Sequence, residues 1–429
     1  MKNYLLKNLQ LILKLLAKLT LKKYKPFIIG VTGSVGKTST KSAIYTILKL
    51  SSTVRMAGGN LNNELGMPLA ILGDYETSSG KTMFWLGVVF KSLWGLLFRA
   101  NYPRTLILEY AADRPGDINY LLTIVKPHIA IVTAVGAIPV HVEFYKDAEA
   151  VAKEKSKLVQ ALRLNDIAVL NFDDPLVMEM KERFAGKTIT YGFGEGADLK
   201  ITSFMNRSEF GKPLGISFKL ETSDNFVPMK IDGIFGSAQA YAVAAAAAVG
   251  LIKGVNLVKI SEALLEYKGE PGRCRLIEGI KNSYILDDTY NSSPLATESA
   301  LGILKDLPAP RKVAVLGDMA ELGKYATYAH EEIGRKVYGA ADVLVTVGAK
   351  ARFIAEGARR AGFHKKNIYS FNDADEAKIE IQKMLESRDL LLIKGSQSVR
   401  TEKIVLEIMA HPELAPQLLI RQYGKWLTS

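Results

Sequence analysis

The chain has 429 residues, of which 48% are apolar, so it is long enough for two or three globular domains with buried cores. Its single cysteine, Cys274, excludes a disulfide framework and favours a reducing, cytoplasmic compartment. The net charge is +12, and the first 25 residues supply +7 of it through seven lysines and no acid. The remainder is only mildly basic and lacks the stripe of basic residues interleaved with aromatics that is expected of a nucleic-acid binder.

The first 26 residues are expected to be a separate basic, amphipathic segment, helical over residues 4–22. At roughly 100° per residue, lysines lie on one side and an apolar face on the other, made of Leu5, Leu9, Ile12, Leu16 and Leu19. Lys25 ends the helix because a residue that precedes proline avoids helical geometry. Lysines inside the apolar stretch, and the lack of a cleavage site after it, argue against a secretory signal and against a membrane span.

An apolar insert at about residues 78–103 is the second segment, beside the N-terminal helix, that could contact either a membrane surface or the rest of the protein. Its apolar run, Met83–Phe98, is shorter than the roughly 20 residues that a span needs, and it contains Lys91. Both segments could lie on an anionic membrane surface as peripheral elements. Alternatively, they could pack together or against the neighbouring domain.

A phosphate-binding loop is the strongest local signal. Phe27–Val31 is predicted to be a buried strand, Thr32–Gly36 a glycine loop and Lys37–Leu50 a helix. Glycines let successive N–H groups point at phosphate oxygens, and the helix adds its positive N-terminal end. Lys37 would reach the terminal phosphates and Thr38 would bind Mg²⁺. The alternative is a glycine turn before a helix, because Val31 stands where the general pattern has glycine.

The region after this loop predicts an α/β domain with a mostly parallel sheet, over residues 27–270. Strands are expected at Thr105–Leu108 and Ile129–Thr133, with a helix at about Gly116–Val125 between them. Glu109 would end the first of these strands, at the sheet edge that holds the phosphate loop, as a Mg²⁺ ligand or an ordinary surface glutamate. Ala238–Gly250 is expected to be a helix that is buried on most sides.

The turn-like Glu270–Arg273 is the candidate domain boundary. After it, alternating strands and helices predict a C-terminal Rossmann-like α/β domain over residues 271–429. Its expected strands are Tyr284–Asp287, Lys312–Leu316, Val343–Val347, Ile368–Phe371 and Leu390–Ile393.

Several motifs together resemble the Mur ligase family. TGSVGKTST (32–40), GNLNNELGMPLAIL (59–72) and LEYAADRPGDI (108–118) are similar to its ATP-binding domain. DDTYNSSP (287–294), LGDMAELG (316–323) and LIKGSQS (392–398) are similar to one branch, which adds D-alanyl-D-alanine to a UDP-muramoyl-tripeptide. The resemblance runs from about residue 27 to 405 and implies an ATP-dependent amide-bond ligase that works through an acyl phosphate. The implied partners are small molecules, and a monomer is expected.

The resemblance also implies roles for individual residues. Nucleotide contacts fall on Gly33, Ser34, Val35, Gly36, Lys37, Thr38, Ser39, Gln239, Arg273, Asp288 and Asn291. Metal ligands fall on Thr38, Glu109 and His141, and Lys155 matches a lysine that is carbamylated in many members. Lys37, Lys155 and His141 form the implied catalytic set. Substrate contacts fall on Asn62, Asn63, Tyr290, Ser292, Pro294, Lys394 and Ser396.

Each role has a plainer alternative. His141 could be a buried or hinge residue, Lys155 a solvated helix lysine, and Asp288–Asn291 a turn. The sequence departs from the family at Phe235 and Gln239, where histidine and asparagine are usual, and residues 1–26 stand where the family has its UDP-sugar-binding domain. The rival functions are a folylpolyglutamate synthase-like ligase and a catalytically weak, membrane-associated nucleotide-binding protein.

Overall fold

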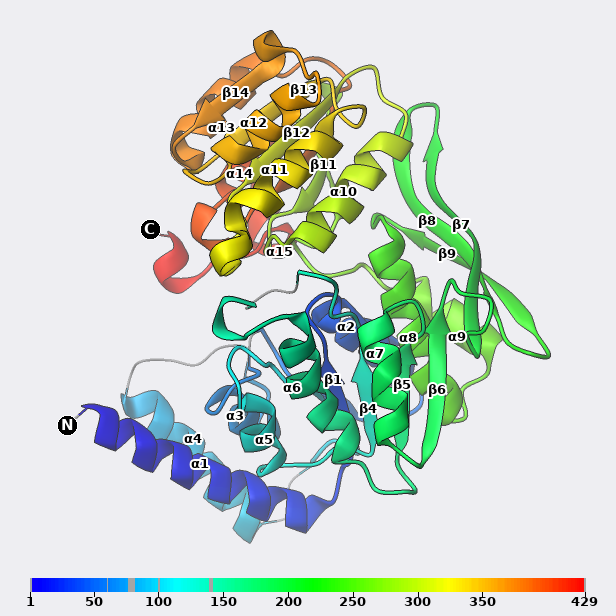
Figure 1. Cartoon of the computed structure of the whole chain (residues 1–429). Coiled ribbons are helices and arrows are strands. Elements are labelled where there is room, and N and C mark those ends of the chain that lie inside the picture. Colours follow the sequence, from blue (N-terminus) through cyan, green and yellow to red (C-terminus); the bar gives the residue numbers. More distant parts are fainter. Residues whose placement is uncertain (1, 60, 76–81, 99–100, 139–141, 428–429) are drawn as a thin grey trace.

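The computed structural model describes the chain except residues 1, 60, 76–81, 99–100, 139–141 and 428–429. Two sheets, both packed against helices, lie one above the other in Figure 1. The predicted α/β class, with a mostly parallel first sheet and a Rossmann-like second one, is confirmed.

The first sheet has the order β2-β3-β1-β4-β5-β6-β7-β8-β9 within the described residues. Its pairs are parallel from β2 to β7 and antiparallel from β7 to β9. The strands are β1 (Phe27–Thr32), β2 (Val54–Met56), β3 (Thr105–Glu109), β4 (Ile129–Val132), β5 (Ile167–Asn171), β6 (Lys187–Gly192), β7 (Leu199–Glu209), β8 (Lys212–Glu221) and β9 (Phe226–Asp232). Strands β5 to β9 had not been predicted.

One face of this sheet packs against α2 (Lys37–Leu48), α8 (Ser237–Ile252) and α9 (Leu257–Leu264). Helix α8 is buried from Ala242 to Gly250, as its alanine-rich sequence predicts. The small side chains let α8 and α2 approach each other and the strands closely.

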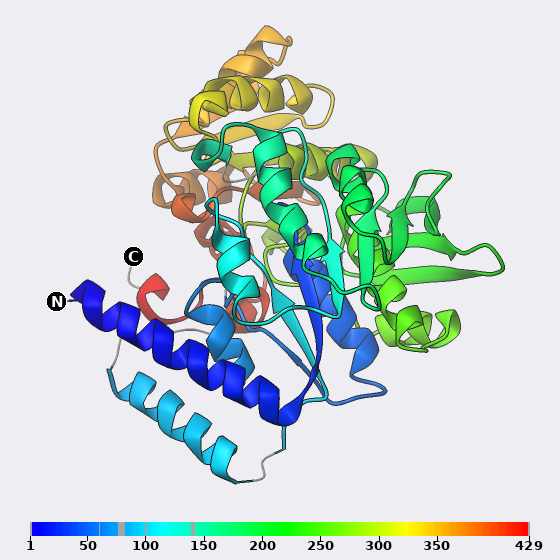
Figure 2. The ribbon, with the colours of Figure 1, turned by 60° about the horizontal axis from the view of Figure 1, so that its bottom comes forward.

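The other face packs against α1 (Lys2–Tyr24), α3 (Gly66–Leu72), α5 (Asp117–Leu122), α6 (Ala148–Gln160) and α7 (Pro175–Met178). Helix α4 (Thr82–Leu97), which is the predicted insert, lies outside this layer and packs on α1 and α3. Figures 1 and 2 show α1 and α4 side by side at one margin of the molecule. No helix in the described part of the chain is both long enough and apolar enough to cross a membrane.

The second sheet has the order β10-β11-β15-β12-β13-β14 among the described residues, and β10 is its antiparallel member. The strands are β10 (Arg275–Glu278), β11 (Tyr284–Asp288), β12 (Lys312–Gly317), β13 (Val343–Val347), β14 (Ile368–Phe371) and β15 (Leu390–Lys394). One face packs against α10 (Pro294–Asp306), α11 (Ala326–Val337) and α12 (Arg352–Arg360). The other packs against α13 (Ala374–Met384), α14 (Glu402–Ile408) and α15 (Ala415–Leu418).

Short 3-10 turns connect these elements. They are η1 (Val142–Phe144), η2 (Glu179–Arg183), η3 (Ile280–Asn282), η4 (Gly323–Tyr325), η5 (Lys365–Asn367), η6 (Gln397–Val399), η7 (Pro412–Leu414) and η8 (Gly424–Leu427).

Candidate active site

The loop between β1 and α2 has the geometry of a phosphate-binding loop. Gly33 and Gly36 have φ values of 143° and 87°, which L side chains rarely adopt. A Cβ on Gly33 would also collide with the Thr133 hydroxyl. The Ser34 N–H donates to the Ala134 carbonyl at 2.6 Å, so the loop is tied to the end of β4. Only glycine at these two positions permits this path.

Two polar groups on this loop are poised toward a ligand. The Lys37 Nζ donates to the Gly33 carbonyl at 2.9 Å, so the side chain lies folded back over the loop. The Ser34 Oγ is buried and has no hydrogen-bond partner among the described residues. A buried hydroxyl without a partner is costly, and a phosphate oxygen would satisfy it.

Glu109 lies where the sequence placed it, at the carboxyl end of β3 and level with Val31 of β1. It is only 5% exposed. It accepts a hydrogen bond from Asn62 Nδ2 at 3.0 Å and pairs with Lys41 Nζ at 3.3 Å. Burial opposes its ionisation, but attraction to Lys41 and Lys37 outweighs that cost and holds the pKa of Glu109 below its usual value. The surface-glutamate alternative is therefore wrong.

The Glu109 carboxylate and the Thr38 hydroxyl fit a magnesium ion whose remaining ligands are water and phosphate oxygens. The described residues contain no group of three or more His, Cys, Asp or Glu side chains that could enclose a metal. Glu109 offers a carboxylate and Thr38 a hydroxyl, and both are hard oxygen ligands. The Thr38 hydroxyl lies 3.4 Å from Arg273 Nη2. His141, the third expected ligand, lies outside the described residues.

Lys155 lies on α6 and is 2% exposed, so the interpretation as a solvated helix lysine is wrong. Burial, with a smaller contribution from Lys37, lowers the pKa of Lys155 to about 7; Asp113 and Glu109 act in the opposite direction. A substantial fraction of this amine is therefore neutral near pH 7, which is the state that can act as a nucleophile.

The C-terminal domain contributes a second buried charged group. The Lys394 Nζ donates to Asp288 Oδ2 at 2.6 Å and to the Asn291 carbonyl at 2.9 Å. The Arg273 guanidinium lies 3.8 Å from the centre of the Tyr290 ring. The DDTYNSSP stretch therefore begins as the end of β11 and is held by specific contacts, which a simple turn would not need.

Two residues that sequence reasoning missed fix the position of this stretch. Asp287 Oδ2 accepts from the Gly272 N–H at 3.0 Å, and burial raises the pKa of Asp287 to about 6. Arg421 donates to the Thr289 and Tyr290 carbonyls, at 3.2 and 2.6 Å. Asp287 stands inside a recognised motif, but no local pattern marks Arg421, which comes from the far end of the chain.

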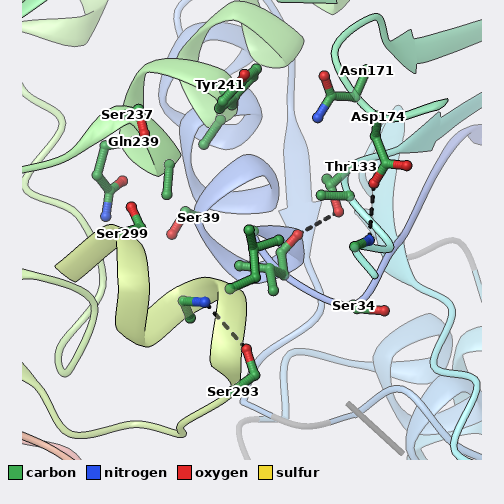
Figure 3. A pocket seen from close by; sticks show the side chains of 18 of the residues that line it. Ser34, Ser39, Thr133, Asn171, Asp174, Ser237, Gln239, Tyr241, Ser293 and Ser299 are labelled. Carbon is green, nitrogen blue, oxygen red and sulfur yellow. Dashed lines mark hydrogen bonds between the residues drawn. The ribbon is translucent and has the colours of Figure 1, made fainter. Parts of the chain in front are cut away.

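A cavity of about 520 Å³ lies between the two sheets (Figure 3). Among the predicted site residues, its walls contain Ser34, Val35, Gly36, Ser39, Gln239, Arg273, Asp288, Asn291, Ser292 and Lys394. The cavity wall does not include Gly33, Lys37, Thr38, Asn62, Asn63, Glu109, Lys155, Tyr290, Pro294 or Ser396. Eight of the eleven predicted nucleotide contacts and two of the predicted substrate contacts thus meet in one space. Thr38 and Glu109, the two expected metal ligands that the structure describes, lie outside its wall.

Several predicted residues serve the architecture around this cavity. Gln239 Nε2 donates to the Arg273 carbonyl at 2.8 Å, and Gln239 Oε1 accepts from Tyr267. Asn63 Oδ1 accepts from the N–H groups of Leu65 and Gly66 at the start of α3. Pro294 begins α10. Ser396 Oγ accepts from the Ala320 N–H at 2.8 Å, which joins the loop after β15 to the loop after β12.

The cavity wall also contains residues that the sequence had not indicated, including Asn171, Asp174 and Tyr241 (Figure 3). Asp174 Oδ2 accepts from the N–H groups of Val135 and Gly136 at 2.7 and 3.0 Å, so it holds the loop after β4 in place. Asp174 also caps α7, and Pro175 follows it. The available signal was an apolar run that ends in Asn-Phe and is followed by Asp-Asp-Pro.

Comparison with known proteins agrees with this geometry. The family model described as Mur ligase middle domain matches residues 31–83 and 95–250, and that described as Mur ligase, glutamate ligase domain matches residues 272–397. A UDP-N-acetylmuramoyl-tripeptide–D-alanyl-D-alanine ligase of Synechocystis is 30% identical over 389 residues, which cover 89% of this chain and 74% of the relative. An enzyme of the same name from Bacillus subtilis is 27% identical over 404 residues, covering 93% and 79%.

Solved structures give the same result. The MurF ligase of Thermotoga maritima, in complex with ADP, is similar with a TM-score of 0.76 and 29% identity, over 92% of this chain and 82% of that one. Folylpolyglutamate synthase of Mycobacterium tuberculosis has a TM-score of 0.64 at 14% identity, over 92% and 95%, which indicates a shared fold.

Proposed function

The chain belongs to the Mur ligase family, and we propose that it is an ATP-dependent ligase that adds D-alanyl-D-alanine to a UDP-N-acetylmuramoyl-tripeptide. The relatives that carry this name are aligned along most of the chain, through both domains. The reaction forms one amide bond and converts ATP into ADP and phosphate.

One observation supports the proposal most strongly. The phosphate loop of the first domain and the DDTYNSSP stretch of the second face one cavity. Gly36 and Ser39 line it from one side, and Asp288 and Lys394 line it from the C-terminal domain. A carboxylate is a poor acylating agent and must be activated, so a ligase has to hold a nucleotide and two further substrates together. A cavity built by two domains suits that requirement, because closure can exclude water from an acyl phosphate.

In the first step, the carboxylate of the muramoyl peptide attacks the γ-phosphorus of ATP, and ADP leaves. The role of Lys37 is to balance the charge that develops on the transferred group, together with the N–H groups of the loop and of α2. Its Nζ would leave the Gly33 carbonyl for the phosphate oxygens, because a charged acceptor is stronger than a neutral one. In the second step, the amine of the dipeptide attacks the acyl carbon and phosphate leaves.

Magnesium, when bound, would neutralise phosphate charge beside Thr38 and Glu109. Glu109 is kept ionised by Lys41 and Lys37, so it is ready to act as a ligand. We assign Lys155 as a carbamylated lysine, which turns a cation into an oxygen donor. Its burial supports this assignment, because a lysine with a pKa of about 7 can present the neutral amine that combines with CO₂.

On the opposite side of the cavity, we assign the incoming dipeptide to the neighbourhood of Lys394 and Ser292. Lys394 is buried and already paired with Asp288, so the pair would present a structured, nearly neutral surface. The folate-type rival is less well supported, because the similarity to folylpolyglutamate synthase is one of fold. We expect the proposed enzyme to act on small-molecule substrates as a monomer.

The test is ADP release by the purified chain. Rapid release with a UDP-muramoyl-tripeptide plus D-Ala-D-Ala, and background release with a folate plus glutamate, is expected. The reverse pattern would show that the chain is a folate-type ligase. Background release with both substrate pairs would show that it binds nucleotide without ligase activity on either pair. For Lys155, the alanine variant should be inactive and partly rescued by short carboxylic acids; full activity without additives would contradict the carbamate.

A further inference from the structure

Helices α1 and α4 expose far more apolar surface than a soluble domain needs. Helix α4 buries Val88 and Ser92 against the protein. Its opposite face is open to solvent, with Phe90 67% and Trp94 56% exposed. The large exposed side chains of this face are Met83, Leu86, Phe90, Leu93, Trp94, Leu97 and Phe98. Contiguous apolar patches of this kind mark interaction sites.

Helix α1 extends this surface. Its sequence-predicted apolar face is divided in the structure, since Leu16 is buried and Leu9 half-buried, whereas Ile12 and Leu19 are exposed. The buried side, with Leu13 and Ala17, joins the core under α3. The exposed apolar side chains are Leu6, Leu11, Ile12, Leu15 and Leu19. Thus α1 is part of the fold on one side and contributes to an open surface on the other.

The ligase fold itself does not require this surface. The match to the Mur ligase middle domain begins at residue 31 and is interrupted between residues 83 and 95, so α1 and the body of α4 both lie outside it. Yet the two helices are specifically joined. Lys23 Nζ donates to the carbonyls of Gly95 and Phe98 at 2.9 Å, and Tyr24 Oη donates to Gly95 at 2.6 Å.

Charge indicates what would cover the surface. Neither helix contains an acidic residue. Lys7, Lys18 and Lys22 are exposed on α1, among the open leucines, and Lys91 is exposed on α4. Long lysine side chains can keep their charge in water or at phosphate groups while their stems cover apolar atoms. At the end of α4, the Trp94 ring packs at a tilt against that of Phe98, with ring centres 4.2 Å apart. Tryptophan favours the boundary between water and lipid.

We propose that the α1–α4 pair is a docking surface for an anionic lipid membrane. The pair would lie in the plane of the headgroups, with the exposed face of α4 inserted by about 5–10 Å. Lysines of α1 would contact the lipid phosphates. It would not span the bilayer, because neither helix is long and apolar enough to do so. A purely apolar protein partner would gain nothing from the lysines, whereas an anionic surface complements both features.

The test is flotation of the full-length protein with lipid vesicles. We expect binding to phosphatidylcholine vesicles that contain about 30 mol% phosphatidylglycerol, weaker binding to pure phosphatidylcholine, and release in about 0.5 M NaCl. Two double variants separate the apolar and the electrostatic contribution to binding. Phe90→Ser with Trp94→Ser removes apolar surface from α4, and Lys18→Glu with Lys22→Glu reverses charge on α1. Each should lower partitioning at least about tenfold. For the lysine pair, the reason is that one basic residue near such a surface contributes roughly a fivefold factor; for the aromatic pair, it is the loss of apolar area that the membrane would bury.

Matched controls use exposed residues elsewhere. Phe210→Ser removes a 93% exposed aromatic at the β7–β8 turn, and Lys365→Glu with Lys366→Glu reverses two exposed charges beside β14. These controls should bind vesicles like the wild type, and all variants should keep the wild-type rate of ADP release. Wild-type protein that fails to float, or variants that float equally well, would overturn the proposal. So would light scattering that shows a dimer dissolved by Phe90→Ser with Trp94→Ser, because a second copy would then cover the surface.

Discussion

At the carboxyl end of β3 the protein buries charges, whereas along α1 and α4 it exposes large apolar side chains. Lys41 and Glu109 are almost inaccessible, while Phe90 and Leu97 are mostly open. Each region reverses the usual distribution of side chains. The first is an ion pair that the protein covers, beside the site that we assign to magnesium and phosphate. The second is the surface that we assign to an anionic membrane. Both reversals carry a cost in the isolated chain, which indicates where partners bind.

The buried pair gives the largest expected effect. Lys41→Met leaves the Glu109 carboxylate without its nearest cation, 3.3 Å away. It should lower the free energy of unfolding by about 3–5 kcal/mol, as for other buried pairs that lose one partner. Urea denaturation measures this. Lys41→Met combined with Glu109→Gln should recover most of the loss. A double variant that loses as much stability as Lys41→Met alone would show that the unpaired carboxylate is not the cause.

Lys37 tests whether this region serves the reaction. Lys37→Ala should reduce kcat/KM for ADP release by roughly 10²–10³-fold, as expected when one charge-stabilising group is removed. Its melting temperature should stay close to that of the wild type, since the side-chain hydrogen bond that Lys37 makes within the described part of the chain is to a carbonyl of its own loop, that of Gly33. Lys49→Ala, at the exposed end of the same helix, is the control and should keep full activity. Near-normal turnover of folded Lys37→Ala would refute the assigned role.

The two sides of α1 can be separated with a matched pair of leucines. Leu13 is fully buried and Leu15 is 59% exposed. Leu13→Ala should destabilise the protein by about 2 kcal/mol or more through lost packing. Leu15→Ala should change stability by less than about 0.5 kcal/mol. Equal effects in thermal and urea unfolding would mean that α1 does not divide its faces in this way.

Lys155 gives the smallest effect and a defined pH window. Its pKa falls from 10.5 to about 7 on folding, so the unfolded chain binds more protons between these values and stability rises with pH across that interval. Below pH 7 the folded protein carries a buried charge. In CO₂-free buffer, Lys155→Met should therefore be more stable than the wild type at pH 6, by an amount on the order of 1–2 kcal/mol. This advantage should shrink toward pH 10, and a pH-independent difference would contradict the assigned shift.

The sequence by itself determined the local elements of this protein. Glycine spacing gave the phosphate loop, because only glycine adopts the backbone at Gly33 and Gly36. An apolar run gave β13 with its observed bounds, because a buried parallel strand needs a nearly continuous run of apolar side chains. The edge strand β14 also has its predicted bounds, although its side chains are only half-buried or exposed. The half-exposed strands from β7 to β9 lack such runs, and they had not been recognised.

Tertiary structure alone decided which side chains are buried and which distant ones meet. Lys155 looks like a surface lysine in its helix, yet packing closes over it. Leu16 and Leu19 share one face of an isolated helix, but the packing of α1 against the rest of the protein buries the first and leaves the second open. Arg421 meets Tyr290 across 131 residues of chain. A sequence pattern reports the neighbours along one element, whereas burial, shifted pKa values and exposed patches depend on which other elements cover it.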